Sequence, residues 1–310
     1  MLVFSDQQIK EILEQILERK DFEILPVGNH HLKRHLVYKV LLPQEKPLIF
    51  KLYYIPRRRS REMASLRLLE NSGVKVPRIL AQGLWEEQYE WLILEYLEGV
   101  LLDQVLCGLD EICKQRLFEE MGEELGKLHD YSSFDYIGEW DEEGRPLGQE
   151  ESYYDYFVQS MERAITHIEN QQLPDKVVLT KSIAELRGNY FCMQIDLVPR
   201  LVHRDFDGRN ILVVQRNGRY SISGILDFEG SYPGNPEENF ISLYYRYFME
   251  DTKLEEAFWR GYTKHLPRPE GFEERLQTYL LAFAIGNCSW ASQQAKDYYE
   301  DNIRLLKKLI

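Results

Sequence analysis

A polar loop at residues 203–210, with an apolar segment on each side, carries residue types that can do chemistry. Asp205 is placed to accept a proton from an attacking hydroxyl group. Asn210, five residues later, offers a neutral oxygen that could bind Mg²⁺. A second acidic stretch follows and contains Asp227 and Glu229. This pattern predicts a site at which oxygen ligands for a hard cation accompany a general base.

A β-hairpin is predicted to position these residues. Residues 211–215 and 220–226 have the pattern of two strands, and the Asn-Gly pair at 217–218 is a favoured two-residue turn. Asn210 and Asp227 then come at the two chain ends of the hairpin, where they can face a shared ion.

A lysine lies within another strand-like segment nearer the N-terminus, residues 48–54. Burying the ammonium group of Lys51 alone would be costly, so it needs an anion. Glu62, eleven residues later, lies near the start of a predicted helix at 61–70 and can supply one. The alternative is a lysine at a strand edge whose side chain reaches water.

The order H-x-D-x-x-x-x-N, strand, turn and D-F-x resembles the aminoglycoside phosphotransferase and choline kinase family, the small-molecule branch of the protein-kinase-like fold. The resemblance covers about residues 20–260 and is specific in 201–214 and 225–229. It implies an α+β fold of two lobes. Residues 1–98 would form a nucleotide-binding lobe with a leading helix and a small antiparallel sheet. Residues 99–310 would form a mainly helical lobe with the catalytic loop and the acceptor site.

The resemblance also implies roles in phosphoryl transfer. Asp205 would orient and deprotonate the acceptor hydroxyl, and His203 would brace the loop. Asn210 and Asp227 would hold Mg²⁺. Glu229 would reach a second Mg²⁺ or the substrate.

Five residues are candidates for binding ATP or GTP, the phosphoryl donor. Lys51 would hold phosphate oxygens with Glu62 behind it. Gly28 is the one glycine in the segment expected to cover the phosphates. Glu95 and Leu97 belong to the expected hinge, whose backbone pairs with the base in this family.

The run Gly-Asn-Pro-Glu-Glu-Asn departs from the family pattern, because Asn235 and Asn239 stand where the family often has aspartates. A structural role for those aspartates would tolerate an amide, so the departure is compatible with catalysis. It weakens the assignment of an acceptor by analogy.

Two clusters have simpler interpretations. His30, His31 and His35 have no Asp, Glu or Cys among them, so a solvated loop is favoured over a metal site. The basic run 57–61 is interpreted as a solvated loop leading into a helix, with a contact to nucleotide phosphate as the alternative.

The composition is that of a globular enzyme. The chain has 310 residues, 44% hydrophobic and 29% charged, which suits one large domain or two lobes. The net charge of −13 argues against nucleic acid and anionic membranes as partners. We expect a cytoplasmic location, because no signal peptide or spanning segment is evident and the cysteines show no C-x-x-C pair. These cysteines are Cys107, Cys113, Cys192 and Cys288.

Acidic residues dominate two segments that are expected to border the acceptor. Residues 135–155 contain eight acids and one base, and residues 227–256 contain eight acids and two bases. Such segments would attract a cationic, hydroxyl-bearing acceptor, an aminoglycoside-type antibiotic first. The alternative is that they are solvated faces.

Other functions remain open. A metabolite kinase of the same family would act on choline, homoserine, methylthioribose or a macrolide. A kinase-like binding or coat protein would be expected to lose at least one of Lys51, Asp205, Asn210 and Asp227, and all four are present. A protein kinase is disfavoured, because the segment after Asp227 is too short for an activation segment.

Overall fold

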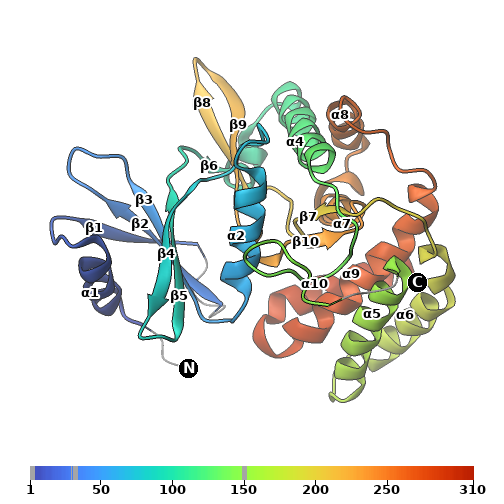
Figure 1. Ribbon diagram of the computed structural model, residues 1–310. Helices are drawn as coiled ribbons and strands as arrows, with labels where there is room; N and C mark the ends of the chain where they lie inside the picture. The colour runs from blue at the N-terminus through green and yellow to red at the C-terminus, as the bar shows by residue number, and fades with distance from the viewer. Residues whose placement is uncertain (1–3, 29, 31–33, 149–151) are drawn as a thin grey trace. The chain divides into compact units, whose positions relative to one another are not determined.

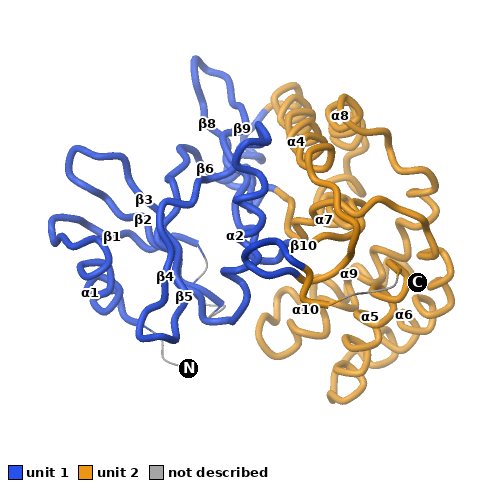
Figure 2. Tube along the Cα trace, in the orientation of Figure 1, with its two compact units in different colours: residues 1–109, 140–145, 208–231 blue, residues 110–139, 146–207, 232–310 orange. Residues whose placement is uncertain are grey.

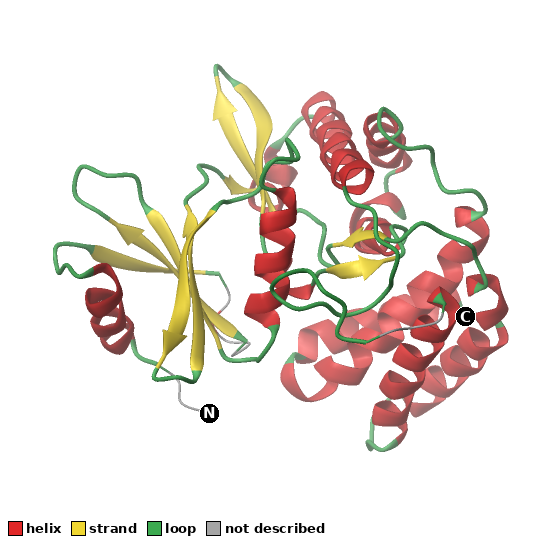
Figure 3. Ribbon diagram, viewed as in Figure 1, coloured by secondary structure: helices red, strands yellow, loops and turns green. Residues whose placement is uncertain are grey.

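The computed structural model describes residues 4–28, 30, 34–148 and 152–310, which fall into two compact units (Figure 2). The first unit comprises residues 1–109, 140–145 and 208–231, and the second comprises 110–139, 146–207 and 232–310. Strands dominate the first unit and helices the second (Figure 3). The predicted α+β fold is confirmed. The functional division after residue 98 stays a prediction.

An antiparallel sheet forms the main part of the first unit (Figure 1). Its strands are in the order β1-β2-β3-β5-β4. Their bounds are β1 (Glu23–Val27), β2 (His35–Leu41), β3 (Leu48–Tyr53), β4 (Ile79–Trp85) and β5 (Tyr89–Glu95). The central position of β3 explains its apolar sequence, because both of its edges are paired and most of its residues are buried.

The leading helix α1 (Asp6–Leu17) packs on one face of this sheet. Its N-terminus is a capping box, in which Ser5 and Gln8 bond each other's backbone. Its buried residue Ile9 belongs to one apolar cluster with Phe50 and Leu52 of β3. Side chains alternate along a strand, so Lys51 points to the opposite face.

The second helix and a small sheet complete the first unit. Helix α2 (Arg58–Leu69) carries the residue opposite Lys51. The small sheet has the order β6-β8-β9. Its strands β8 (Ile211–Arg216) and β9 (Arg219–Ile225) are the predicted hairpin, and the positive φ angles of Asn217 and Gly218 suit its tight turn. The remaining elements are β6 (Val100–Leu101), the short helix α3 (Leu102–Val105) and the 3₁₀ turns Leu106–Gly108 and Phe228–Gly230.

Helices make up most of the second unit. They are α4 (Glu111–Tyr131), α5 (Tyr153–Glu169), α6 (Lys176–Gly188), α7 (Glu238–Leu243), α8 (Thr252–Tyr262), α9 (Phe272–Gln294) and α10 (Lys296–Leu309), with a 3₁₀ turn at Tyr190–Met193 and a π-helical turn at Tyr244–Phe248. The strands β7 (Arg200–Val202) and β10 (Tyr232–Gly234) pair antiparallel among them. No helix in the described ranges is long and apolar enough to cross a membrane.

Two glycines allow α4 and α8 to approach closely. A Cβ atom on Gly122 would lie 1.9 Å from the carbonyl oxygen of Phe258, and one on Gly261 would lie 1.9 Å from that of Glu119. Buried aromatic rings fill the adjoining core around Phe240, which contacts the rings of Phe258, Trp259, Tyr262 and Phe272. This packing holds α7, which follows β10, against α8 and α9.

Candidate active site

The predicted ion pair lies at the centre of the first unit. Lys51 Nζ is 2.7 Å from Glu62 Oε2, and the hydroxyl of Tyr53 donates to the same oxygen at 2.6 Å. Lys51 is 4% exposed and Glu62 is 2% exposed, so a strand-edge lysine that reaches water is excluded. The ammonium group is therefore buried beneath the central strand and does not reach the edge of the sheet.

Two further carboxylates face the same ammonium group. Lys51 Nζ lies 2.6 Å from Asp227 Oδ1 and 3.4 Å from Glu229 Oε2. Glu229 also contacts His35 Nδ1 at 2.6 Å and the guanidinium of Arg58. Sequence reasoning missed His35 and Arg58, because their partner is more than 170 residues away in the chain.

Burial and the neighbouring charges shift the pKa values of this cluster in opposite directions. Burial alone would lower the pKa of Lys51, but the surrounding carboxylates, that of Asp227 first, outweigh burial and raise the pKa above the usual lysine value. Burial would likewise raise the pKa of Glu229, but Lys51 and the neighbouring histidine and arginine bring it well below the usual range. For Glu62 burial is the larger effect, so its pKa is raised. Lys51 is therefore a charged ammonium group, as a role in holding anionic oxygens requires.

The hairpin brings its two chain ends together, as predicted. The backbone N–H of Leu226 donates to the carbonyl of Asn210 at 2.8 Å, which makes Asn210 and Asp227 neighbours at the open end. Asp227 has φ 67°, in the left-handed region that a non-glycine residue seldom adopts. A strained backbone of this kind is frequent at functional sites.

Asp227 and Asn210 fit a magnesium ion better than Glu229 does. One oxygen of Asp227 binds Lys51, and the other has no partner among the described residues. Both oxygens of Glu229 already contact cations. His35, Asp227 and Glu229 place ligand atoms within 4.8 Å of one another. Imidazole is a poor ligand for Mg²⁺, so His35 is best interpreted as the partner of Glu229.

The remaining nucleotide-binding candidates also lie in the first unit. Gly28 directly follows β1 and has φ 80°. Glu95 ends β5, and its carboxylate pairs with Arg78 at 3.1 Å. Leu97 packs so closely on Gly224 that a Cβ atom there would lie 2.4 Å from its Cδ1 atom. These contacts are structural, and a role in binding a nucleotide stays a prediction for all three residues.

The loop predicted to be catalytic begins in the second unit, immediately after β7. His203 is buried, whereas Asp205 is exposed and so accessible to a substrate. Asn239 of α7 is fully buried, and its Oδ1 atom accepts from the backbone N–H groups of His203 (2.7 Å) and Arg204 (3.3 Å). The asparagine flagged as a departure therefore braces the loop that presents Asp205.

Asn239 in turn is held by a buried histidine. Its Nδ2 group lies 2.7 Å from Nε2 of His129 and donates to the carbonyl of Leu201 at 3.1 Å. The other ring nitrogen of His129 lies 2.9 Å from the hydroxyl of Tyr262. Burial, assisted by Arg200, lowers the pKa of His129 to about 3, so the ring is neutral. A neutral Nε2 atom can accept from the amide, so His129 has a structural role in holding Asn239.

Two simple interpretations of the sequence are wrong. His30 and His35 are not in a solvated loop, since His30 Nε2 lies 3.0 Å from the carbonyl oxygens of both Val27 and Val37, and His35 begins β2. His31 lies outside the described residues. The basic run is only partly solvated: Arg57 is exposed, whereas Arg58 and Arg59 are in α2 and pair with carboxylates.

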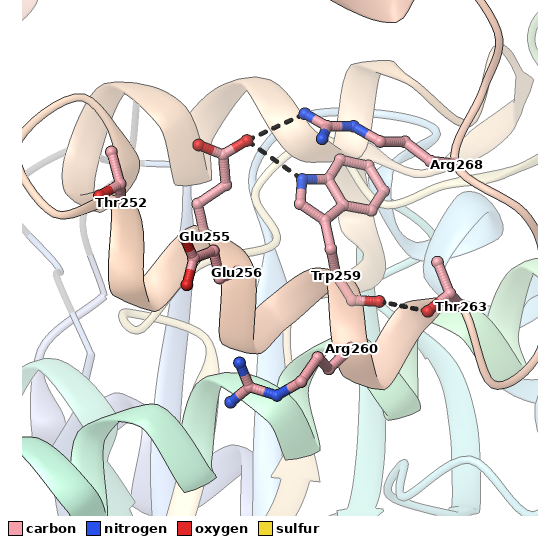
Figure 4. Close-up of a pocket in the computed structure, with 7 residues that line it drawn as sticks. All are labelled: Thr252, Glu255, Glu256, Trp259, Arg260, Thr263 and Arg268. Atoms are coloured by element: carbon pink, nitrogen blue, oxygen red, sulfur yellow. Dashed lines mark hydrogen bonds and ion pairs between the residues drawn. The ribbon is translucent and has the colours of Figure 1, made fainter.

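A wide hollow of about 630 Å³ lies along α8 (Figure 4). Figure 4 shows Glu255 bonded to both Arg268 (2.9 Å) and the indole of Trp259 (3.3 Å). The guanidinium also lies over the indole, 4.5 Å from the ring centre. None of the predicted site residues lines this hollow.

Solved structures of two aminoglycoside phosphotransferases and of a protein assigned as a sugar-amine kinase share this fold at low sequence identity. Aminoglycoside phosphotransferase APH(4)-Ia has a TM-score of 0.75 and 14% identity, over 98% of this chain and 97% of that chain. APH(2")-IIa, solved with gentamicin, has a TM-score of 0.65 and 18% identity over 99% and 97%. A protein from Haemophilus somnus 129PT assigned as a fructosamine-3-kinase has a TM-score of 0.61 and 14% identity over 97% and 96%.

The family is shown by sequence. No curated protein matches the chain. The model of a family described as the phosphotransferase enzyme family matches residues 31–272, which is most of the chain. The predicted recognition and the predicted enzyme class, a phosphotransferase that acts on hydroxyl groups, are thereby confirmed. This chain belongs to the phosphotransferase enzyme family and is a small-molecule phosphotransferase with a kinase-like fold.

Proposed function

We propose that the protein transfers the γ-phosphoryl group of ATP or GTP to a hydroxyl of a small cationic acceptor, an aminoglycoside-type molecule first. The observation that carries the proposal is the buried Lys51 ammonium, which contacts Glu62 and Asp227. Lysine held between a helix glutamate and a metal-binding aspartate is the arrangement that positions nucleotide phosphates in kinases. A thermostable mutant of APH(4)-Ia was solved with AMP-PNP and hygromycin B, which supports a nucleotide donor.

Each residue has a distinct task in this proposal. Lys51 holds phosphate oxygens, and Glu62 fixes its position. Asp205 orients the acceptor hydroxyl and takes its proton as the oxygen attacks phosphorus. Asp227 and Asn210 hold Mg²⁺, which when bound neutralises charge on the phosphates. Gly28, Glu95 and Leu97 are proposed to contact the nucleotide. Glu229 helps to position Lys51, because it contacts Lys51 together with His35 and Arg58.

The case for a cationic acceptor now rests on fewer residues than the sequence indicated. Many acids of the two acidic segments pair with cations of the chain itself, namely Asp141, Glu142, Glu143, Asp227, Glu229, Glu237, Glu250 and Glu255. Glu150 and Glu151 lie outside the described residues. Asp135 is exposed and lines a hollow of about 330 Å³, and Glu238 has no ion pair among the described residues. These two carboxylates, with the exposed Glu256 on α8, are the candidates to meet a cation.

The second candidate function is a kinase for an amine-bearing sugar metabolite. The structural likeness to the protein assigned as a fructosamine-3-kinase supports it. Gentamicin, hygromycin B and fructosamines share hydroxyl groups and a protonated amine. The same site chemistry would therefore serve either acceptor class.

A phosphorylation assay across a panel of acceptors tests the proposal. The panel comprises aminoglycosides, a fructosamine, choline, homoserine, methylthioribose and a macrolide, each with MgATP and MgGTP. We expect turnover with at least one cationic acceptor. Asp205→Asn should lower that turnover at least about a hundredfold while the melting temperature changes little. Exclusive use of a neutral or anionic acceptor would contradict the cationic class, and an active Asp205→Asn variant would remove Asp205 from the mechanism.

A further inference from the structure

Arg204 has an unusual position beside the proposed catalytic base. Its backbone has φ 73°, and its N–H is held by Asn239 Oδ1 at 3.3 Å. The left-handed backbone is unfavourable for a residue with a side chain, so the surrounding structure must impose it. The side chain of Arg204 lies over the ring of Tyr232, and its guanidinium carbon is 5.5 Å from the ring centre.

No hydrogen bond with a described residue fixes the guanidinium of Arg204. Within the described ranges it forms no ion pair, lies over the face of Tyr232, and is attracted by the carboxylates of Glu238 and Asp205, which help to raise its pKa. The residue is also exposed. A cation–π contact at an exposed site is a weak interaction, so a second cation can compete with the guanidinium for the ring of Tyr232 and the charge of Glu238.

The surroundings of Arg204 favour a cation. The hydroxyl of Tyr232 donates to Glu238 Oε2 at 2.6 Å, and the ring of Tyr156 lies 5.4 Å from that of Tyr232. Glu238 is half-buried and forms no ion pair among the described residues. Burial raises its pKa, and the nearby Arg204 and the hydroxyl of Tyr232 offset only part of this effect. Two aromatic faces beside an unpaired carboxylate form a site suited to an ammonium group.

We propose that Arg204 is a specificity-determining residue that occupies, in the acceptor-free enzyme, the place over Tyr232 and beside Glu238 where the ammonium group of the acceptor binds. The acceptor must displace the side chain, and its ammonium group then pairs with Glu238. The inference rests on the proposed function, because it names the site for the cationic group of that acceptor. Asp205 is the next residue in the chain, so the acceptor's hydroxyl would lie near the base.

The test uses tetramethylammonium, which carries the charge and no hydroxyl group. Its dissociation constant is measured by ligand-observed NMR at constant ionic strength, with tert-butanol as the neutral probe. Arg204→Gly and Arg204→Asn both remove the competing cation, and both residues tolerate a positive φ. We expect each to bind tetramethylammonium about two- to fivefold more tightly than wild type, which corresponds to the loss of one cation–π contact.

Two further variants make the test specific. Arg216→Ala removes an exposed arginine of β8 and should leave the affinity unchanged, which controls for net charge. Glu238→Gln should weaken binding in the wild-type background and cancel the gain in Arg204→Gly. Circular dichroism confirms that each variant is folded.

Unaltered or weaker binding in both Arg204 variants, or no binding to any protein, would overturn the inference. The panel assay separates this failure from that of the proposed function. Turnover of a cationic acceptor without the expected order of affinities would refute the site and keep the kinase assignment. The expected order of affinities without turnover of any acceptor would keep the site and refute the proposed function.

Discussion

Lys51 is a buried cation whose charge depends on the carboxylates that face it. Because Glu62 and Asp227 come from different elements, the ammonium group connects α2 to the end of the β8–β9 hairpin within the first unit. Removal of one partner leaves a buried charge without compensation. The resulting loss of stability exceeds the net stability that the intact pair contributes. Two predictions follow at this scale.

The first concerns the pair itself. Lys51→Ala should lower nucleotide affinity and turnover by at least about tenfold each, because it removes the cation proposed to hold the phosphates. Glu62→Ala should have a smaller effect of the same kind. If the residues act as a unit, the double variant loses much less than the sum. Calorimetry and steady-state kinetics measure both, with the exposed Lys20→Ala as control. Additive losses would show that the two side chains act independently.

The second prediction separates Asp227 from Glu229 as magnesium ligands. Asp227→Ala should abolish the Mg²⁺-dependent part of nucleotide binding, because Asn210 alone supplies no anionic oxygen. Glu229→Gln should keep most of that part, since both oxygens of Glu229 already contact Lys51, His35 or Arg58. Calorimetric titration of each variant with ATP, once in the presence of Mg²⁺ and once in the presence of a chelator, gives the Mg²⁺-dependent part of the affinity. An equal loss in both variants would make Glu229 a ligand.

At the scale of elements, α4, α7 and the catalytic loop meet at one hydrogen-bond network. His129 of α4 contacts Asn239 of α7, and Asn239 holds the backbone of His203 and Arg204. The network requires a neutral imidazole, since a protonated Nε2 atom could not accept from the amide. The position of Asp205 therefore depends on the protonation state of a residue on a distant helix.

This network predicts an acid-labile fold. The pKa of His129 is about 3 in the folded protein and near 6.5 when unfolded, so the unfolded state binds the extra proton. Stability from the neutral ring is complete above about pH 6.5 and is lost as the pH falls toward 3, by up to about 1.4 kcal/mol per unit. Urea titrations from pH 7 to 4 should show a shallower loss for His129→Gln than for wild type. Parallel curves would mean that His129 is protonated in the folded state.

At the scale of the whole molecule, the net charge of −13 should act on the acceptor. We expect the KM of a cationic acceptor to rise severalfold between low and high salt at a fixed nucleotide concentration. Salt screens the protein's charges, and at an ionic strength of 0.1 M their attraction extends only about 10 Å. A neutral acceptor analogue provides the control. The rise should be moderate, because many of the acids have partners within the chain. A KM that does not depend on salt would indicate recognition by short-range contacts alone.

The sequence by itself determined the elements and the reactive residues. Lys51 stood out because a charge inside an apolar strand needs a partner, and Glu62 was the predicted partner. The Asn-Gly turn fixed the hairpin that joins Asn210 to Asp227, since such turns depend on local backbone geometry. The spacing of His203, Asp205 and Asn210 indicated the family, and the family comparison confirmed it.

Only the tertiary structure decided which distant side chains meet. His35 and Arg58 looked like solvated residues, and their contact with Glu229 depends on how the small sheet packs on α2. Asn239 and His129 are 110 residues apart, so no local pattern could pair them. The sequence specifies backbone preferences and burial within one element. The partner of a buried polar group depends on side-chain packing between elements, and that packing also determined which acids are left to meet a substrate.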